Sequence, residues 1–391
     1  MKKLACVVFA AIGVAAVACR SGKAKPRADD GGAASISTTK AAATTSSSEP
    51  APKPGMAWIP AGTLKAGTPP DAVPRLPDEE LPGTAIQMNG FYIDLLPYPN
   101  EPNAIPTTNI TRDEAEALCV QKGKRLCTEL EWERACKGPD NAIYGYGDTY
   151  RADACGTGVP VEQSARRPTG EHAQCKNAFG VLEMHGSVWE WTSSSWGRGS
   201  PNASHGVLRG GNSVAGELVG RCANSIGRSP SKKSPTMGLR CCAGPKNEVE
   251  VKLETKGAPG IGPQPLSLVD TYASELVSAI LTHGPAWTDN PGIEKSSRRA
   301  WRWVPVLNEE LAVVMGCSDT PPRVCGLVVG RIVDGKPQSL LKAIVGRDLP
   351  ELSRLGDARH LRIRALDNAG IFSRAITYAY GRVSLGDPTR P

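Results

Sequence analysis

The chain has 391 residues, a formal net charge of +7 at pH 7 and a pI near 8.8. This length suggests two to three domains. The 46 basic residues are scattered among 39 acidic ones without a basic stripe, which argues against a nucleic-acid-binding protein. Four Phe against 42 Gly and 33 Pro indicate a loop-rich architecture rather than long helices.

The N-terminus has the pattern of a targeting segment. Two lysines precede the apolar run Leu4–Ala18, which is too short for a stable membrane span. The run ends in Ala-Val-Ala-Cys, which resembles a bacterial lipobox, so we expect residues 1–18 to be removed and Cys19 to carry a lipid. Ordinary signal cleavage after Ala18 is the alternative.

Residues 19–54 are rich in Ala, Ser, Thr, Lys and Pro and hold almost no large apolar side chains. Such a segment cannot bury enough surface to fold, so we expect a disordered tether. Together with the lipid at Cys19, this predicts a lipoprotein of the cell envelope, anchored in the outer membrane. The chain would then lie in an oxidising compartment, where most cysteines form disulfides.

Two capping boxes predict the starts of two helices. In Thr111–Glu114 and Thr128–Glu131, a Thr hydroxyl and a Glu carboxylate can satisfy the free backbone amides of a helix start. The first helix should end at Gly123 and the second at Gly138-Pro139. Pro97–Asn100, which precedes the first helix, should be a loop or an edge strand. Its two prolines cannot donate hydrogen bonds to a central β-ladder.

The stretch Asn177–Trp191 combines two carboxylates with a glycine between them. A tight turn at Gly186–Ser187 would bring Glu183 back toward Glu190 and direct carbonyls between them. Calcium prefers six to eight such oxygen ligands, so the spacing is compatible with a Ca²⁺ site. The two tryptophans that flank Glu190 should face a core. The alternative is a buried hairpin with two solvated acids.

This stretch resembles a signature of the formylglycine-generating (sulfatase-modifying factor) family, N-x-F/Y-G-L-x-D/N-M-x-G-N-V-W-E-W. Further segments resemble motifs of the same family in the same order, and together they cover residues 55–245: Met56–Gly62, Gly90–Asp94, Gly123–Glu133, Tyr144–Asp148, Leu208–Ser213 and Gly238–Cys241. The resemblance implies an α+β fold, the C-type-lectin-like fold of that family, with little regular secondary structure.

The resemblance also implies a set of site residues. A structural Ca²⁺ would be held by Glu183, the carbonyls of Gly186 and Val188, and Glu190, and Asp153 aligns with a ligand of a second Ca²⁺. Two implied disulfides are Cys119–Cys241 and Cys136–Cys222. Four further cysteines allow three pairings, which the sequence leaves open: Cys127, Cys155, Cys175 and Cys242.

The family's oxidase converts a peptidyl cysteine into formylglycine, using Cu(I) bound by two thiols five residues apart. Here the corresponding interval Asn212–Arg221 contains no cysteine. Counting from either end places Ala215 and Gly220, or Asn212 and Glu217, at those positions. Copper is therefore not expected, because Cu(I) requires soft thiolate ligands. His185, beside the predicted turn, is interpreted as a lone surface histidine.

Residues 246–265 have the composition of a linker, and residues 266–391 are expected to form a small β-sandwich-like domain. Leu268–Leu281 is a short amphipathic helix or a strand pair. Cys317 and Cys325 flank a turn and should form a disulfide. Five short segments that run apolar or alternate between apolar and polar residues predict strands: Trp301–Leu307, Leu311–Met315, Gly326–Val333, Leu361–Leu366 and Ile371–Tyr380.

The sequence therefore predicts a lipid-anchored, non-catalytic module that is stabilised by Ca²⁺. Its expected ligand is a protein or glycan of the envelope, and no nucleic acid. The alternative is an active oxidase that converts sulfatase cysteines to formylglycine with an unrecognised ligand set.

Overall fold

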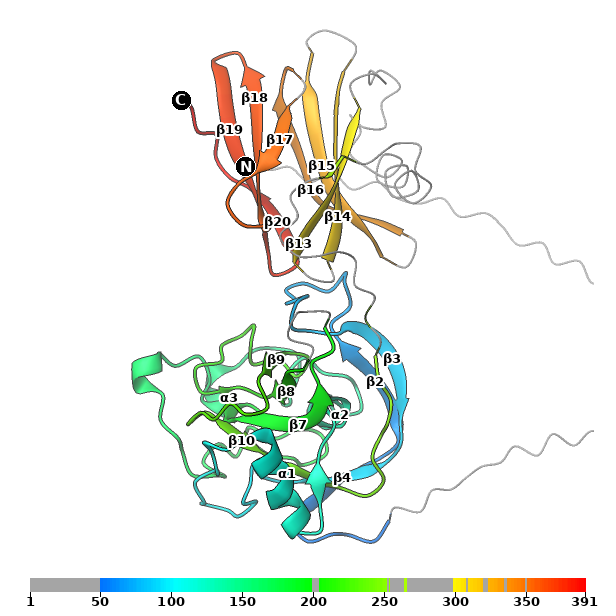
Figure 1. Cartoon of the computed structure of the whole chain (residues 1–391), viewed down its shortest axis with the longest axis vertical. Helices are drawn as coiled ribbons and strands as arrows, with labels where there is room; N and C mark the ends of the chain where they lie inside the picture. Colours follow the sequence, from blue (N-terminus) through cyan, green and yellow to red (C-terminus); the bar gives the residue numbers. More distant parts are fainter. Residues whose placement is uncertain are drawn as a thin grey trace, which may run out of the picture. The chain divides into compact units, whose positions relative to one another are not determined.

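The computed structural model describes residues 50–198, 204–251, 253, 264–265, 298–306, 309–318, 323–333, 336–348 and 350–391 (Figure 1). All of them belong to one compact unit, Glu49–Pro391. The predicted signal peptide, the lipidation site Cys19, most of the tether and the segment Leu268–Leu281 lie outside the described residues. Within the described ranges, every helix is too short or too polar to cross a lipid bilayer.

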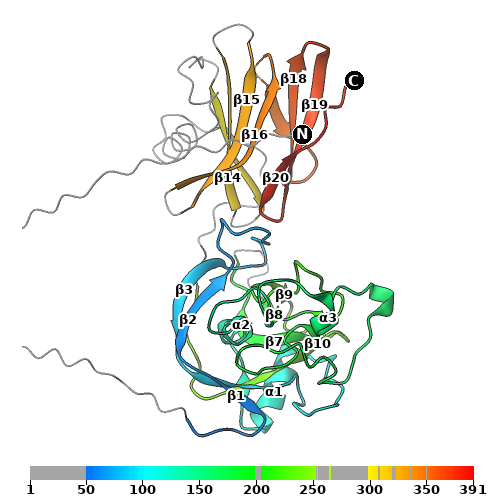
Figure 2. The ribbon, with the colours of Figure 1, turned by 180° about the vertical axis from the view of Figure 1, so that it is seen from behind.

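The first sheet brings together distant parts of the N-terminal half. Its strands, in spatial order, are β1 (Met56–Ile59), β4 (Phe91–Asp94), β11 (Cys241–Ala243) and β5 (Arg125–Leu126). All neighbours are antiparallel. A separate hairpin of β2 (Gly62–Gly67) and β3 (Pro82–Met88) curves along the side of this half (Figure 2). The segment Pro97–Asn100 is a turn, as predicted.

Helices α1 (Arg112–Gln121) and α2 (Glu129–Lys137) start at the two predicted capping boxes. In each, the Thr hydroxyl accepts the backbone N–H of the Glu three residues later, and that Glu accepts the N–H of the Thr. Two short elements follow, α3 (Ala152–Cys155) and the 3-10 helix η1 (Val161–Gln163). This half is mostly strand and loop with few helices.

A second sheet contains the tryptophan-rich stretch. Its order is β10 (Met237–Leu239), β7 (Trp189–Ser195), β8 (Gly206–Arg209) and β9 (Ser225–Arg228). Strand β7 pairs parallel with β10 and antiparallel with β8. The short β6 (Gly186–Ser187) forms parallel bridges with Asn212. The predicted hairpin at this position is therefore wrong, because β7 takes both of its partners from later in the chain.

Two of the hydrophobic clusters in this half take the cysteines of β11. One contains Cys119, Cys241, Trp189 and Trp191. The other contains Cys127, Cys242, Trp132 and the first-sheet residues Phe91 and Ile93. Successive side chains of a strand point to opposite faces, so the adjacent cysteines of β11 enter different clusters.

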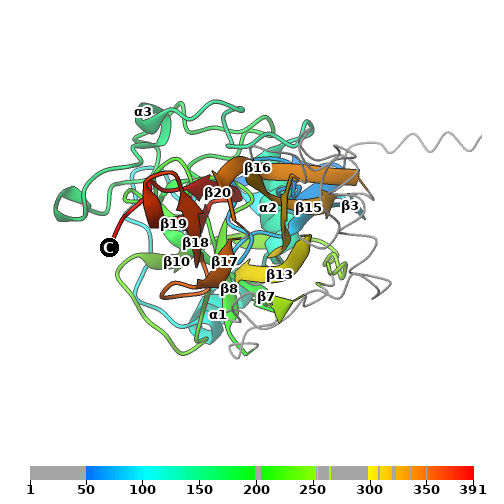
Figure 3. The same cartoon turned by 90° about the horizontal axis from the view of Figure 1, so that it is seen from above.

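The C-terminal half consists of two antiparallel sheets. The first, in spatial order, contains β12 (Gln264–Pro265), β13 (Arg299–Val306), β14 (Glu309–Cys317), β15 (Cys325–Val333) and β16 (Lys336–Gly346). The second contains β17 (Glu351–Arg354), β18 (His360–Asp367), β19 (Gly370–Ala379) and β20 (Arg382–Leu385). Strands β18, β19 and β20 follow one another across the sheet in the view of Figure 3.

One core cluster takes side chains from both sheets, including Trp303 and Val313 from the first and Ile363 and Ile376 from the second. Each of the five predicted strand segments corresponds to a strand: β13, β14, β15, β18 and β19. Strands β16, β17 and β20 were not predicted. Strand β16 is mostly half-exposed, so its sequence lacks the continuous apolar run that marks the buried strands.

Candidate functional site

Gly186 fixes the backbone at the centre of the predicted calcium stretch. It has a φ of +80°, and a Cβ at this position would lie 2.1 Å from the carbonyl oxygen of Cys155. Only glycine tolerates both conditions. The chain bends at Met184–His185 rather than at the predicted turn, and Gly186 itself belongs to the short strand β6.

Glu190 is buried, so the alternative of a solvated acid is wrong. Its Oε2 accepts a hydrogen bond of 2.6 Å from Trp132 Nε1. Arg240 donates from Nη2 to Oε1 at 3.0 Å and from Nε to Oε2 at 3.1 Å. The flanking tryptophans pack into a core cluster, as predicted. The sequence did not assign a role to Arg240, although it lies within the motif Gly238–Cys241. Its position beside a cysteine in a short apolar segment was the available signal.

Arg240 joins three parts of the chain. Besides Glu190, it donates to the carbonyl oxygens of Asp94 at 2.9 Å and Leu182 at 2.9 Å. With 1% of its surface exposed, the guanidinium has almost no contact with water. A buried charge of this kind must be paired and hydrogen-bonded, and the carboxylate of Glu190 supplies that pairing.

The Glu183 carboxylate has different hydrogen-bond partners from that of Glu190. Its Oε1 accepts the backbone N–H of Gly170 at 2.9 Å, and burial raises the pKa of the Glu183 carboxyl. Glu183 and Gly186 line a small space of about 10 Å³, which is close to the volume that one water or ion needs. Val188 and Glu190 do not line it.

The predicted donors still fit the chemistry of Ca²⁺, because all of them are oxygens of carboxylates or backbone carbonyls. Each carboxylate oxygen has two lone pairs. Trp132 and Arg240 occupy both oxygens of Glu190, whereas the hydrogen bonds to the Glu183 carboxylate reach only Oε1. Of the four implied ligands, Glu183 and Gly186 line a common space that an ion could enter, whereas Val188 and Glu190 lie outside it. Asp153 lies exposed on α3 and does not line this space.

His185 is buried, so its interpretation as a surface histidine is wrong. It is 3% exposed and lies against the Cys136–Cys222 disulfide, with Nε2 3.2 Å from Cys136 Sγ. The same Nε2 accepts the N–H of Gly145 at 3.1 Å. Burial lowers the pKa of His185 to about 4, so the ring is neutral at pH 7. The chain segments that cover it are distant in sequence, and no local pattern indicates them.

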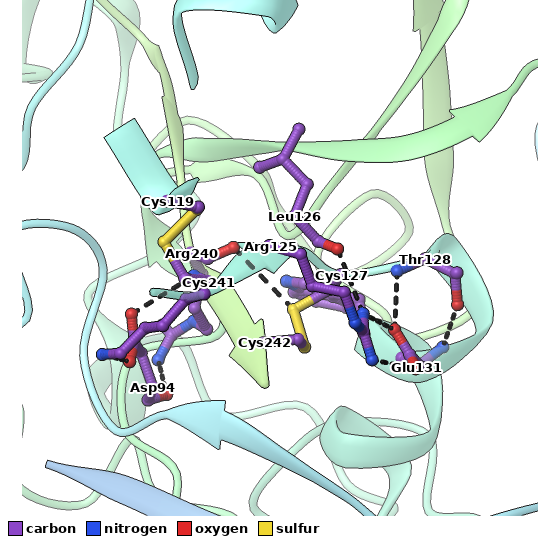
Figure 4. The surroundings of a disulfide bond; sticks show 12 residues. Asp94, Cys119, Arg125, Leu126, Cys127, Thr128, Glu131, Arg240, Cys241 and Cys242 are labelled. Carbon is purple, nitrogen blue, oxygen red and sulfur yellow. Dashed lines mark hydrogen bonds and ion pairs between the residues drawn. A yellow bond between two sulfur atoms is a disulfide. The ribbon is translucent and has the colours of Figure 1, made fainter. Parts of the chain in front are cut away.

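The ten cysteines of the described residues form five disulfides. Three are the predicted pairs Cys119–Cys241, Cys136–Cys222 and Cys317–Cys325. Among the pairings left open, the structure has Cys127–Cys242 and Cys155–Cys175. Figure 4 shows Cys241 and Cys242 reaching their partners on opposite sides of β11.

The network beside these disulfides is structural. Arg125 donates to both carboxylate oxygens of Glu131, at 2.7 and 2.8 Å (Figure 4). The same carboxylate caps α2 at Thr128. Every acceptor of Glu131 is therefore occupied by the fold itself, and the group is not available for chemistry.

Neither predicted register of the copper positions supplies a thiol. Asn212 forms the bridge to β6, and Ala215 and Gly220 are buried. Glu217 is exposed, and its carbonyl oxygen accepts a hydrogen bond of 2.8 Å from Tyr144. All ten cysteines of the described residues are in disulfides, so this part of the chain has no free thiolate.

Comparison with known proteins agrees with this geometry. Residues 97–244 match the family described as the sulfatase-modifying factor enzyme 1-like domain. These residues form a domain of this family. The domain therefore includes both capped helices, the tryptophan-rich stretch, Arg240 and four of the five disulfides.

Curated relatives of this sulfatase-modifying factor-like domain differ in activity. The formylglycine-generating enzyme of Bos taurus is 28% identical over 163 residues, which are 35% of this chain and 44% of that protein. The inactive C-alpha-formylglycine-generating enzyme 2 of Bos taurus is 26% identical over 36% of this chain and 50% of that protein. Hercynine oxygenase of Mycolicibacterium smegmatis is 36% identical over 24% of this chain and 22% of that protein. The chain thus spans at most about half of these relatives.

Among solved structures, PvdO from Pseudomonas aeruginosa has a TM-score of 0.40 and 20% identity, over 49% of this chain and 99% of that one. CarF has a TM-score of 0.36 and 15% identity, over 48% of this chain and 97% of that one.

Proposed function

We propose that the sulfatase-modifying factor-like domain is a non-catalytic binding or scaffolding module. The observation that supports this most is the state of the cysteines, since all ten in the described residues are consumed by disulfides. Cu(I) binds soft thiolates, and none of the described cysteines is free to hold it. The relatives include a protein named inactive, so loss of the oxidase activity has a precedent among similar chains.

The alternative, an oxidase of sulfatase cysteines, is tested by peptide oxidation. The full chain is incubated with Cu(I), oxygen and a peptide that bears a sulfatase-type cysteine, and formylglycine is followed by mass spectrometry. We expect no product above the level of Cu(I) alone. The variant with both Asn212→Cys and Glu217→Cys tests whether thiols alone are missing. Formylglycine formed by the unmodified chain at rates typical of enzymes would contradict the proposal.

We also propose that Ca²⁺ stabilises the domain through Glu183, Gly186, Val188 and Glu190. Support comes from the oxygen donors and from the small space beside Glu183. An ion that binds only the folded state raises the melting temperature by mass action. Removal of Ca²⁺ with a chelator should therefore lower the melting temperature, and added Ca²⁺ should restore it. If neither the chelator nor added Ca²⁺ changes the melting temperature of the parent or of Glu183→Gln, the calcium proposal is wrong.

We propose that the protein is located in the cell envelope. The lipid on Cys19 would anchor it in the outer membrane, and the domain would face an oxidising compartment. Five disulfides fit an oxidising, extracytoplasmic compartment. The ligand would be an envelope protein or glycan. Labelled palmitate should enter the parent chain and be absent from Cys19→Ser, which should leave the membrane fraction. Equal labelling of the two would exclude this anchor.

For the fold, we infer that residues 55–245 adopt the C-type-lectin-like arrangement of this family. The two C-terminal sheets with their common core are compatible with a small β-sandwich-like domain. An experimental structure of the full chain tests both assignments. Both architectures are widely used for recognition, but a fold alone does not define a ligand.

A further inference from the structure

A cavity of about 420 Å³ lies in the N-terminal half, away from Glu183 and Glu190. Three segments line it, within residues 65–74, 137–150 and 217–223. Its apolar wall includes Val73 and Ile143, which are 41% and 44% exposed. The rings of Tyr144 and Tyr150 stand 5.6 Å apart on the same lining. Exposed apolar side chains grouped around a cavity indicate a binding surface.

Two of the cations that line this cavity form ion pairs with buried carboxylates of the protein itself. Lys137 Nζ forms an ion pair of 2.8 Å with Glu133 and donates to the carbonyl oxygens of Lys65 and Gly67. Arg221 forms an ion pair with the buried Glu80. Their positive charges are therefore neutralised inside the protein and do not attract an anion into the cavity.

The acids on the lining are not neutralised in this way. Glu217 and Asp148 are exposed, and neither forms an ion pair with another described residue. Asp148 Oδ1 accepts the backbone N–H of Ile143 at 3.0 Å, which holds the carboxylate in place and leaves its second oxygen unused. Lys65 is the one lining cation outside such a pair in this part of the chain. The unpaired lining charge is therefore negative.

We propose that this cavity binds a protonated primary amine on an apolar stem, a ligand class that extends the proposed binding function and rests on it. Val73 and Ile143 pack against the stem, and Glu217 and Asp148 pair with the ammonium. The ring of Tyr150 adds cation–π attraction. Such an amine is either a lysine side chain of a partner protein or a free alkylamine.

The experiment uses the full chain and isothermal titration calorimetry with hexylammonium, hexanol and hexanoate. Only hexylammonium combines the stem with the positive charge, so we expect it to bind and the other two to bind at least about tenfold more weakly. Equal affinity for hexanol and hexylammonium would overturn the proposal, because it would leave the two carboxylates without a role.

Matched variants locate the site. Glu217→Gln and Asp148→Asn should each weaken hexylammonium about tenfold, and Asp148→Asn keeps an oxygen acceptor for Ile143. Glu116→Gln removes one charge from an exposed acid on α1 that does not line the cavity, and it should have no effect. If Glu217→Gln binds as the parent does, or if Glu116→Gln weakens binding equally, the site is wrong.

A lysine-containing peptide and its Nε-acetylated form distinguish the two sources of the amine. Binding of the lysine peptide more tightly than hexylammonium, with loss on acetylation, identifies a protein partner. Hexylammonium binding as tightly as the peptide identifies a free amine. The titrations need neither copper nor a peptide thiol, so their result is independent of the oxidation assay that tests the proposed function.

Discussion

Arg240 Nη2 lies 3.0 Å from Glu190 Oε1, and each residue exposes 1% of its surface. Removal of one partner leaves a buried charge without compensation, which typically costs about 3–5 kcal/mol of stability. Glu190→Gln and Arg240→Met should each lower the free energy of unfolding by about 4 kcal/mol, as measured by urea denaturation.

The double variant should cost less than the sum of the two single variants, because neither charge is then left alone. The surface pair of Lys246 and Glu248, with an N–O distance of 3.5 Å, provides the control. Glu248→Gln should change stability by less than about 0.5 kcal/mol. Additive losses in the double variant would show that the two buried groups do not stabilise one another.

His185 should make stability depend on pH. Its pKa is about 4 in the folded chain, whereas an imidazole in the unfolded chain binds a proton near pH 6.5. The unfolded state therefore takes up the proton first as pH falls, so stability is complete above pH 6.5 and is lost between pH 6.5 and 4. The loss should reach about 3 kcal/mol near pH 4.

His185→Asn removes this titration, and its side chain can still accept the N–H of Gly145. The variant should be less stable than the parent at pH 7, and the difference should shrink as pH falls to 4. Urea denaturation at several pH values measures it. A difference that stays constant with pH would mean that His185 does not titrate in this window.

Gly186→Ala should be far more damaging than Gly123→Ala. Both glycines have positive φ, +80° and +67°, so both alanines incur the left-handed backbone cost of about 1–2 kcal/mol. Only at Gly186 would the new Cβ meet a carbonyl oxygen, 2.1 Å away, while Gly123 has open space. We expect more than about 3 kcal/mol for Gly186→Ala in thermal or urea unfolding. Similar losses at both positions would show that the Cys155 backbone moves aside freely.

The disulfides should differ in how much they stabilise the folded state. In the chain-entropy model the bond between Cys119 and Cys241, separated by 122 residues, stabilises by about 5 kcal/mol. The bond between Cys317 and Cys325, separated by 8 residues, should stabilise by about 2.5 kcal/mol. Paired Cys→Ala variants of each bond, compared by urea denaturation, measure the difference. The reverse order would argue that strain or residual structure dominates over loop length.

Local features of the fold were predictable because their causes are local. A capping box needs only residues i and i+3, so both helix starts could be placed from the sequence. The alternating tryptophans around Glu190 likewise indicated which side chains enter the core. The five predicted C-terminal strands were found because their sequences either run apolar, as in β14 and β15, or alternate between apolar and polar residues, as in β18.

The candidate site was less predictable because its contacts join distant segments. Glu190 and Arg240 are separated by 50 residues, and no periodicity connects them. His185 is covered by the Cys136–Cys222 bond and by the turn at Gly145, which the sequence does not place beside it. The four cysteines whose partners the sequence left open allow three pairings. Only the path of β11 through the sheet determines which pairing forms.

Cys241 and Cys242 lie next to each other near the end of the domain, yet their partners are 122 and 115 residues upstream. The chain is synthesised from its N-terminus, so neither native cross-link can close until Cys241 and Cys242 have been made. Until then Cys119 and Cys127 have no native partner. A product that ends before β11 could form neither bond, so both disulfides require a chain that extends at least to Cys242.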